Sequence, residues 1–332
     1  MDADSAAVQR RRVIAAPVPA DTLIPVSARV RAHFGASSHR GRLRTENDDH
    51  YLILRHVQHL DTLLTSVTNN DLPTAVDEFA YAAVVADGIG PAGSGSVAAR
   101  LAVSTLARVA LRFGHWHSQV DPSVAAEVLE RAEWLYQQTD EVVRQRSQAE
   151  ADLTGMAATL TGIYSVGTDL FVANIGHSRC YLFRAGALVQ LTRDDTLRQR
   201  LATSGSPVPV VQAIDDMHHI LTNVIGTGEA GARPVVEHFR LVDDDTLLLC
   251  TNGLTDTVSD DAIAEALASR RTQADQCEQL VDLALENGTE DNVTVVIANY
   301  RVLASIQPSE SSDAYSTSSP PVFGTMPLVQ PE

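Results

Sequence analysis

An aspartate on a glycine turn follows the apolar run at residues 79–86, and it is the feature of this sequence that most suggests chemistry. The turn reads Asp87-Gly-Ile-Gly-Pro-Ala-Gly. A carboxylate at the end of a strand suits a hard cation, because the glycines after it let a backbone carbonyl approach a ligand. An Asp-Gly pair alone is more often an ordinary turn, so Asp87 becomes a metal candidate only if other acids lie nearby.

Three further polar segments adjoin apolar runs that read as strands. They are, in chain order, 44–49 before the run 50–54, 252–256 after the run 246–251, and 289–291 before the run 292–297. If these segments converge with Asp87, carboxylates from several strands share one site. Mg²⁺ and Mn²⁺ prefer such a shell of oxygen ligands. The sequence therefore predicts a candidate centre for divalent metal ions.

The order of these motifs resembles the metal-dependent serine/threonine protein phosphatases of type 2C, the PPM family, in its bacterial form. The family's Arg-x-x-Asn-x-Asp pattern is met from Arg44 to Asp49, and its Asp-Gly-x-Gly from Asp87 to Gly90. The resemblance covers roughly residues 28–301. The other matching segments are Gly95-Ser-Val-Ala98, Met156-Ala-Ala-Thr-Leu160, Val172-Ala-Asn-Ile-Gly-His-Ser-Arg179, Leu191-Thr-Arg-Asp194, Leu247-Leu-Leu-Cys-Thr-Asn-Gly-Leu254 and Asp291-Asn-Val-Thr294.

The resemblance implies an α+β fold, a four-layer α-β-β-α sandwich of two antiparallel sheets flanked by helices. The residue patterns agree, because strands and helices are grouped and do not strictly alternate as in a parallel doubly wound sheet. Helical periodicity lies near 94–113, 122–149, 260–270 and 274–287. Strand-like runs lie near 29–37, 50–55, 79–86, 158–165, 169–175, 179–184, 187–191, 236–242, 246–251 and 292–300.

One domain with two tails accounts for the chain of 332 residues. We expect a disordered N-terminal segment at 1–27, the phosphatase-like domain at 28–302 and a disordered Ser- and Pro-rich tail at 303–332. Residues 195–235 are rich in turn residues and read either as a flap beside the site or as a variable surface insertion.

The net charge and the cysteine content indicate which classes of binding partner and which cellular compartment to expect. A formal net charge of −17 argues against non-specific binding to nucleic acid or to an anionic membrane. No apolar run approaches the roughly 20 residues of a membrane helix. Three widely spaced cysteines, Cys180, Cys250 and Cys277, read as buried small hydrophobes and not as metal ligands or a nucleophile. A reducing, cytoplasmic location is expected.

The resemblance assigns the metal ligands residue by residue. Asp87 would bridge two ions of Mn²⁺ or Mg²⁺, and the carbonyl of Gly88 would bind the first. Asp291 would bind the second ion, Asp48 would reach the first through water, and Asp49 would support that shell. Two ions at this spacing activate a water molecule and clamp a phosphoryl group.

The sequence departs from the family pattern at two positions. Asn252 stands where the family has a metal-binding aspartate, so one negative charge is lost and the second site should bind more weakly. His177 stands where the family has an aspartate of a third metal site, of which only Asp256 keeps its carboxylate. The third site is therefore expected to be lost or weak. His177 reads either as a general acid or as a tolerated histidine beside a degraded site.

Two functions remain open. The first is a protein phosphatase that hydrolyses phosphoserine and phosphothreonine by attack of a metal-activated water. Arg44, Asp87 and His177 would then be its catalytic residues, and Arg44 would hold the substrate phosphate unless it forms an ordinary surface salt bridge. Its partners would be a phosphorylated protein and a cognate Ser/Thr kinase. The second is a weak or inactive pseudophosphatase that binds phosphoproteins, and a small phosphorylated metabolite is a third possible substrate.

Overall fold

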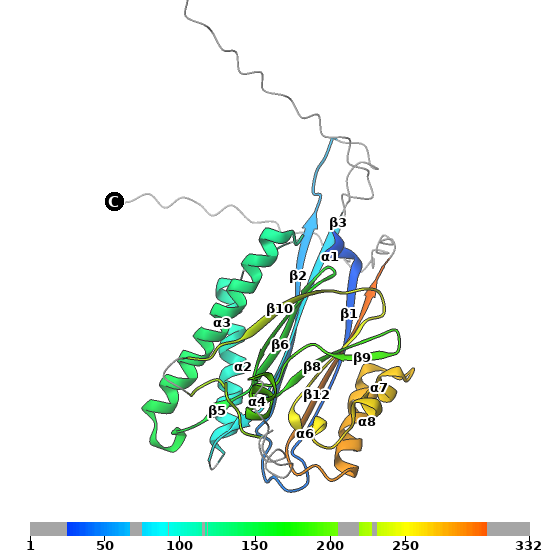
Figure 1. Cartoon of the computed structure of the whole chain (residues 1–332). Helices are drawn as coiled ribbons and strands as arrows, with labels where there is room; N and C mark the ends of the chain where they lie inside the picture. The colour runs from blue at the N-terminus through cyan, green and yellow to red at the C-terminus, as the bar shows by residue number, and fades with distance from the viewer. Residues whose placement is uncertain are drawn as a thin grey trace, which may run out of the picture.

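Two antiparallel sheets pack face to face in the computed structural model, which describes residues 25–66, 75–91, 93–114, 117, 119–204, 219–227 and 231–303 (Figure 1). Each of the two sheets has five strands. The strands of sheet A are, in spatial order, β1 (Val30–His39), β12 (Val293–Val302), β11 (Thr246–Cys250), β8 (Arg179–Arg184) and β9 (Ala187–Gln190).

Sheet B carries the long hairpin that leads to Asp87. Its spatial order is β10 (Val235–Arg240), β7 (Asp169–Ile175), β6 (Leu160–Val166), β3 (Ala75–Ala86) and β2 (His50–Asp61). A separate short ladder pairs β4 (Gly88–Ile89) with β5 (Ala157–Ala158).

Helices cover the outer face of both sheets. Two long helices, α2 (Ser94–Phe113) and α3 (Pro122–Ala149), pack on sheet B, while α7 (Asp260–Ala268) and α8 (Gln273–Glu286) pack on sheet A (Figure 1). Local signals set their starts, because Asp121 caps α3 by accepting from two backbone N–H groups and Thr272 begins α8 with a capping box. Shorter pieces are α1 (Val26–Arg29), α4 (Leu197–Ser204), α6 (Asn252–Thr255) and the 3₁₀ turn η2 (Ala151–Leu153). No helix in the described ranges is long and apolar enough to cross a membrane.

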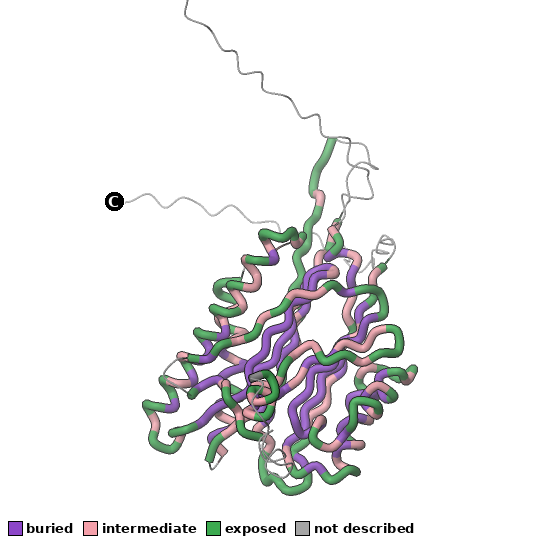
Figure 2. The backbone as a smooth tube through the Cα atoms, in the orientation of Figure 1, coloured by how far each residue is buried: buried purple, intermediate pink, exposed green. Residues whose placement is uncertain are grey.

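Three apolar clusters hold the four layers together. Figure 2 shows that buried residues follow the strands of both sheets. The central cluster lies between the sheets and includes Tyr81 and Val172 of sheet B against Leu249 and Tyr300 of sheet A. The other two join α2 and α3 to sheet B and α7 and α8 to sheet A. The predicted α+β sandwich is therefore confirmed. Cys180, Cys250 and Cys277 are all buried and free, as predicted.

The folded part begins slightly earlier than the boundary expected at residue 28. Residues 26–27 already belong to α1, and the hydroxyl of buried Ser27 donates to Glu78 Oε2 at 2.8 Å. This contact to β3 orders the segment, which has no local periodicity of its own. Residues 1–24 and 304–332, the bulk of the two expected tails, lie outside the described residues.

The β2–β3 hairpin also extends further than the runs predicted at 50–55 and 79–86. Its ladder continues to the pair Asp61 and Ala75, although β6 pairs with β3 only from Ala80 to Val85. The ends of β2 and β3 near Asp61 and Ala75, beside which the described residues form no third strand, therefore make a two-stranded arm that projects from the sandwich (Figure 1). Of the expected flap at 195–235, residues 195–204, which include α4, 219–227 and 231–235 are described, and residues 205–218 and 228–230 are not.

Candidate metal centre

Strand pairing brings the predicted acids to one end of the sandwich. In sheet B, His50 pairs with Ala86, so the residues just outside that pair, Asp49 and Asp87, are neighbours. In sheet A, Cys250 pairs with Val295, and the ladder continues as Thr251 N donates to the carbonyl of Thr294 at 3.0 Å. The turns before β12 and after β11 therefore lie beside each other as well.

A threonine hydroxyl joins the two sheets at this end. Thr251 Oγ1 donates to Asp49 Oδ2 at 2.7 Å and accepts from the backbone N–H of Thr294 at 2.9 Å. Thr251, Asp49 and Thr294 are all buried. The hydroxyl thus uses its proton and a lone pair on two groups that no water reaches, and it fixes the carboxylate of Asp49 relative to sheet A.

An asparagine beside Asp291 holds the loop that carries Arg44 and Asp48. Asn292 Oδ1 accepts from the backbone N–H of Asp48 at 2.8 Å, and its Nδ2 donates to the carbonyls of Arg40 and Glu46, each at 2.9 Å. Neither Asn292 nor Thr251 was given a role from sequence. Their adjacency to Asn252 and Asp291 was the available signal, because residues next to candidate ligands often position them.

Glycines let the Asp87 turn pack against the start of α2. A Cβ on Gly88 would lie 2.1 Å from the carbonyl oxygen of Gly95 and 2.7 Å from that of Asp48. Any side chain at Gly88 would therefore push the turn away from the Asp48 loop. Ser96 N completes the contact by donating to Asp48 Oδ1 at 3.1 Å, near the N-terminus of α2.

The clustered carboxylates repel one another in a buried setting. Burial raises the pKa of Asp87 well above its ordinary value, and the negative charges of Asp49, Asp291 and Asp48 raise it further. Burial likewise raises the pKa of Asp49 to about 7, although hydrogen bonds from Thr251 and Thr294 oppose the shift. Burial raises the pKa of Asp48 as well, against the N–H of Ser96. Acids that destabilise one another in this way suit a cation.

One carboxylate oxygen in this cluster lacks a partner among the described residues. Asp49 Oδ1 is buried and has no hydrogen-bond partner, which is costly for a carboxylate unless a ligand occupies that position. In the described part of the chain, however, no three His, Cys, Asp or Glu side chains form a ready metal-binding group. Asp291 Oδ1 is instead engaged by Arg44 Nη2 at 3.0 Å and by Asn292 N at 2.9 Å. The oxygen donors of these acids are of the kind that divalent cations prefer, and Asp291 would have to release Arg44 to bind one.

Arg44 lies beside the candidate metal centre, where it forms an ion pair with Asp291, one of the candidate metal ligands. Its side chain is 56% exposed in the ion pair with Asp291. A guanidinium at this place can also fork onto a phosphate. The salt bridge and the phosphate-binding role expected for Arg44 would therefore use the same position of its side chain.

The corner with the atypical residues has a different chemistry. Asn252 Nδ2 donates to Asp256 Oδ2 at 3.0 Å, so the amide occupies the carboxylate that a third ion would need. His177 is buried, and its Nδ1 has no hydrogen-bond partner. Burial lowers the pKa of His177, against the charges of Asp256 and Asp194, so the ring is neutral near pH 7. A neutral imidazole is a poor general acid, which favours the tolerated-histidine reading.

A family model described as "Protein phosphatase 2C" matches residues 71–286, which is more than half of the chain. The chain belongs to the protein phosphatase 2C family. The predicted family is therefore confirmed. The match stops short of Arg44, Asp48, Asp49 and Asp291, whose placement comes from the geometry above.

Curated relatives and solved structures agree with this family. The chain is 32% identical over 248 residues to the serine/threonine protein phosphatase PstP of Mycobacterium tuberculosis, which covers 75% of this chain and 45% of the relative. It is 33% identical over 222 residues to the serine/threonine phosphatase stp of Listeria monocytogenes, covering 64% and 82%. The catalytic domain of PstP in complex with 2 manganese ions superposes with a TM-score of 0.62 at 29% identity, covering 82% and 99%.

The chain spans less than half the length of the mycobacterial phosphatase that it matches. The matched structure, in contrast, is a catalytic domain and is covered almost entirely. The similarity therefore concerns the catalytic domain of this type 2C relative.

Proposed function

We propose that this chain is a metal-dependent protein phosphatase that hydrolyses phosphoserine and phosphothreonine. The observation that carries the proposal is the cluster of Asp48, Asp49, Asp87 and Asp291 at one end of a type 2C sandwich, with a buried oxygen of Asp49 left without a partner. Relatives named as serine/threonine phosphatases support the same activity.

The residues divide the work as follows. Asp87, the Gly88 carbonyl and Asp291 would hold the divalent ions, and Asp48 and Asp49 would support them. When bound, Mn²⁺ or Mg²⁺ supplies the positive charge that lowers the pKa of a water molecule and neutralises the transferring phosphoryl oxygens. Arg44 leaves Asp291 and orients the substrate phosphate through its guanidinium fork. Thr251 and Asn292 keep the acids in register, and His177 is not assigned a proton-transfer role.

Two ions and no strongly bound third ion are part of this proposal. The relative's structure with 2 manganese ions supports the number and the metal. The hydrogen bond from Asn252 to Asp256 supports the weak third site. A phosphorylated protein as substrate, a cognate Ser/Thr kinase and a cytoplasmic location also belong to the proposal.

The pseudophosphatase remains as a second candidate for one reason. Asn252 and His177 fall on the same corner of the site and together remove two carboxylates that the family pattern has there. A protein whose second-ion site is weakened could still bind phosphorylated residues through Arg44.

Hydrolysis assays separate the two. Purified protein is given p-nitrophenyl phosphate and a phosphothreonine peptide across a titration of Mn²⁺ and Mg²⁺, with Asp87→Ala as the control. We expect metal-dependent turnover that the control abolishes. A folded wild-type protein with no turnover at any metal concentration would contradict the enzyme and favour the pseudophosphatase.

A further inference from the structure

A pocket of about 450 Å³ lies where the chain leaves β9 and enters α4. The residues that matter in its lining are Arg179, Thr192, Arg193, Asp194, Thr196 and Arg198, and we call it the arginine pocket. Nothing in the assignment of the metal centre uses it.

The arginine pocket carries net positive charge in a chain whose formal net charge is −17. Asp194 is the one acid among its described lining residues, and it is neutralised by Arg179, whose Nε and Nη2 donate to it at 3.0 and 2.7 Å. The side chains of Arg193 and Arg198 are exposed and form no salt bridge within the described residues, although the charge of Arg193 acts on the carboxylate of Asp195. Two guanidinium groups that hold no carboxylate in a salt bridge are therefore placed to bind an anion.

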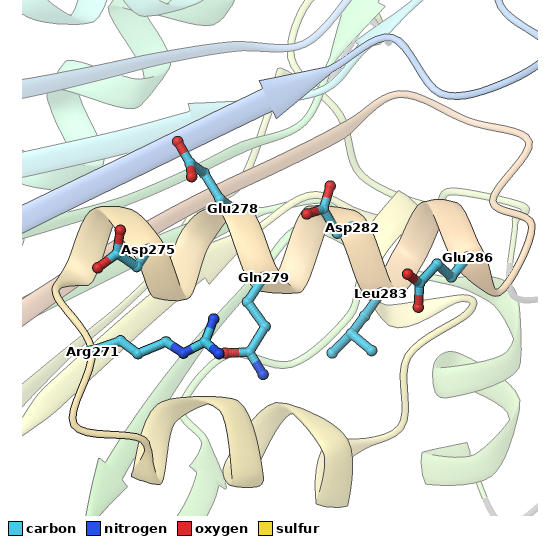
Figure 3. Close-up of a pocket in the computed structure, with 7 residues that line it drawn as sticks. All are labelled: Arg271, Asp275, Glu278, Gln279, Asp282, Leu283 and Glu286. Atoms are coloured by element: carbon cyan, nitrogen blue, oxygen red, sulfur yellow. The ribbon is translucent and has the colours of Figure 1, made fainter.

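A second pocket of similar volume shows that this charge is not a general property of the surface. It runs along α8 and is lined by Asp275, Glu278, Asp282 and Glu286 with Arg271 as its one cation (Figure 3). An anionic ligand would be repelled there and attracted to the arginine pocket.

The arginine pocket adjoins the candidate metal centre through a fixed backbone. Asp195 N donates to the carbonyl of Gly176 at 2.9 Å, and Gly176 N donates back to Asp195 Oδ2 at 3.1 Å. The next residue, His177, is within electrostatic reach of both Asp194 and Asp291. Asn174 Nδ2 also donates to the carbonyl of Arg193 at 3.1 Å, so the backbone at Arg193 is held beside Gly176.

We propose that the arginine pocket binds a second phosphoryl group of the substrate. The preferred substrate is then a protein segment phosphorylated at two nearby residues, one at the metal centre and one held by Arg193 and Arg198. This inference rests on the proposed phosphatase function and names the substrate class of the same site.

The chemistry of the pocket fits a phosphoryl group better than a carboxylate. A phosphorylated side chain carries roughly two negative charges and three acceptor oxygens, enough for two guanidinium forks. A carboxylate carries one charge and is satisfied by one fork. Thr192 adds a donor, because its Oγ1 accepts from Cys180 N at 3.0 Å and keeps its own proton free.

A peptide series tests the inference. Each peptide carries phosphothreonine at a fixed position and, at successive positions on either side, phosphoserine, serine or aspartate. We expect at least one doubly phosphorylated peptide to show kcat/KM about tenfold above its serine counterpart, as charge-assisted hydrogen bonds at a half-exposed site would give. The gain should shrink as salt is raised, and aspartate should reproduce only a small part of it.

Arginine variants test whether the gain in kcat/KM comes from the arginine pocket. Arg193→Ala combined with Arg198→Ala should remove the gain while leaving the hydrolysis of p-nitrophenyl phosphate and of the singly phosphorylated peptide unchanged. Arg200→Ala combined with Arg233→Ala removes the same charge from exposed arginines outside the pocket lining. This control should keep the gain.

Fluorescence anisotropy with Asp87→Asn protein reports peptide binding without turnover, so the inference is tested even if the wild-type protein hydrolyses nothing. Equal rates and equal binding for singly and doubly phosphorylated peptides at every spacing would overturn it and leave the phosphatase standing. A gain that survives in the Arg193 and Arg198 variant would show that the arginine pocket is not the site. A gain that aspartate matches would show that the ligand need not be a phosphoryl group.

Discussion

At the scale of single residues, the candidate metal centre depends on side chains that connect the acids as much as on the acids. The buried hydroxyl of Thr251 is the direct link between Asp49 of one sheet and the backbone of the other. Removing it leaves two buried polar groups without partners.

Thr251→Val keeps the shape of the side chain and deletes the hydroxyl. We expect it to lower the free energy of unfolding by about 1–3 kcal/mol, the cost of leaving a buried hydrogen-bonding group unsatisfied. Urea denaturation measures this, and Thr251→Ser should restore most of it. A stable valine variant would show that the link is not needed for folding.

Asn252→Asp returns the missing charge to the second-ion site. We expect Mn²⁺ to bind about tenfold more tightly, because each added carboxylate strengthens an all-oxygen site. Calorimetric titration measures the affinity, with Gln273→Glu on α8 as a control for net charge. Equal affinity in wild type and variant would mean that position 252 does not reach the ion.

His177→Asp tests the role of the neutral imidazole. Because burial lowers the pKa of His177, we expect turnover at saturating Mn²⁺ to survive the change and the pH–rate profile to show no histidine limb near neutral pH. Turnover that falls steeply in this variant, with loss of such a limb, would restore the general-acid role.

At the scale of secondary-structure elements, the candidate metal centre lies where β2 and β3 of one sheet and β11 and β12 of the other end. The turns at these strand ends must approach each other closely. A Cβ on Gly253, the second residue of α6, would lie 2.0 Å from the carbonyl oxygen of Asn292. The turn after β11 therefore contacts the turn before β12 through bare backbone.

Gly253→Ala should force these two turns apart. We expect a loss of about 1–3 kcal/mol in stability, as for other overpacked sites, together with weaker metal binding because Asn252 and Asp291 separate. Thermal unfolding with and without Mn²⁺ measures both effects. Thr255→Ala on the same helix is the control, and identical behaviour of the two variants would argue against the close approach.

At the scale of the whole molecule, the sandwich buries several acids at one end of an already acidic protein. An acid whose folded pKa is raised binds more protons in the folded than in the unfolded state, so its contribution to stability falls as pH rises between the two values. For Asp49 this interval runs from about 4 to about 7.

Without added metal, stability should therefore decrease between about pH 4 and pH 7, by an amount on the order of a few kcal/mol. Burial lowers the pKa values of half-buried His50 and buried His177, and these two histidines act in the opposite direction. The diagnostic is therefore the difference from Asp87→Asn, which should show a flatter profile. Urea titrations in EDTA measure it. Adding Mn²⁺ at pH 8 should raise the stability of the wild type only. A steeper profile in the variant would contradict the assignment.

The sequence by itself determined what short-range physics controls. The bounds of α2 and α3 and of β7 and β8 follow from hydrophobic periodicity, and for α3 from the cap at Asp121, so prediction and structure agree there. The family motifs in the sequence identified the candidate metal-binding acids. Short elements such as α4 and the arm beyond residue 55 were missed, because pairing with distant segments stabilises them.

Only the tertiary structure decided how the named residues meet. Thr251 and Asp49 are 202 positions apart, and no local pattern specifies that a hydroxyl on one sheet donates to a carboxylate on the other. The same holds for Arg44 on Asp291 and for the buried surroundings of His177. Residue types fix which groups can bind a cation or move a proton, while packing fixes their distances, burial and charge, which are what chemistry depends on.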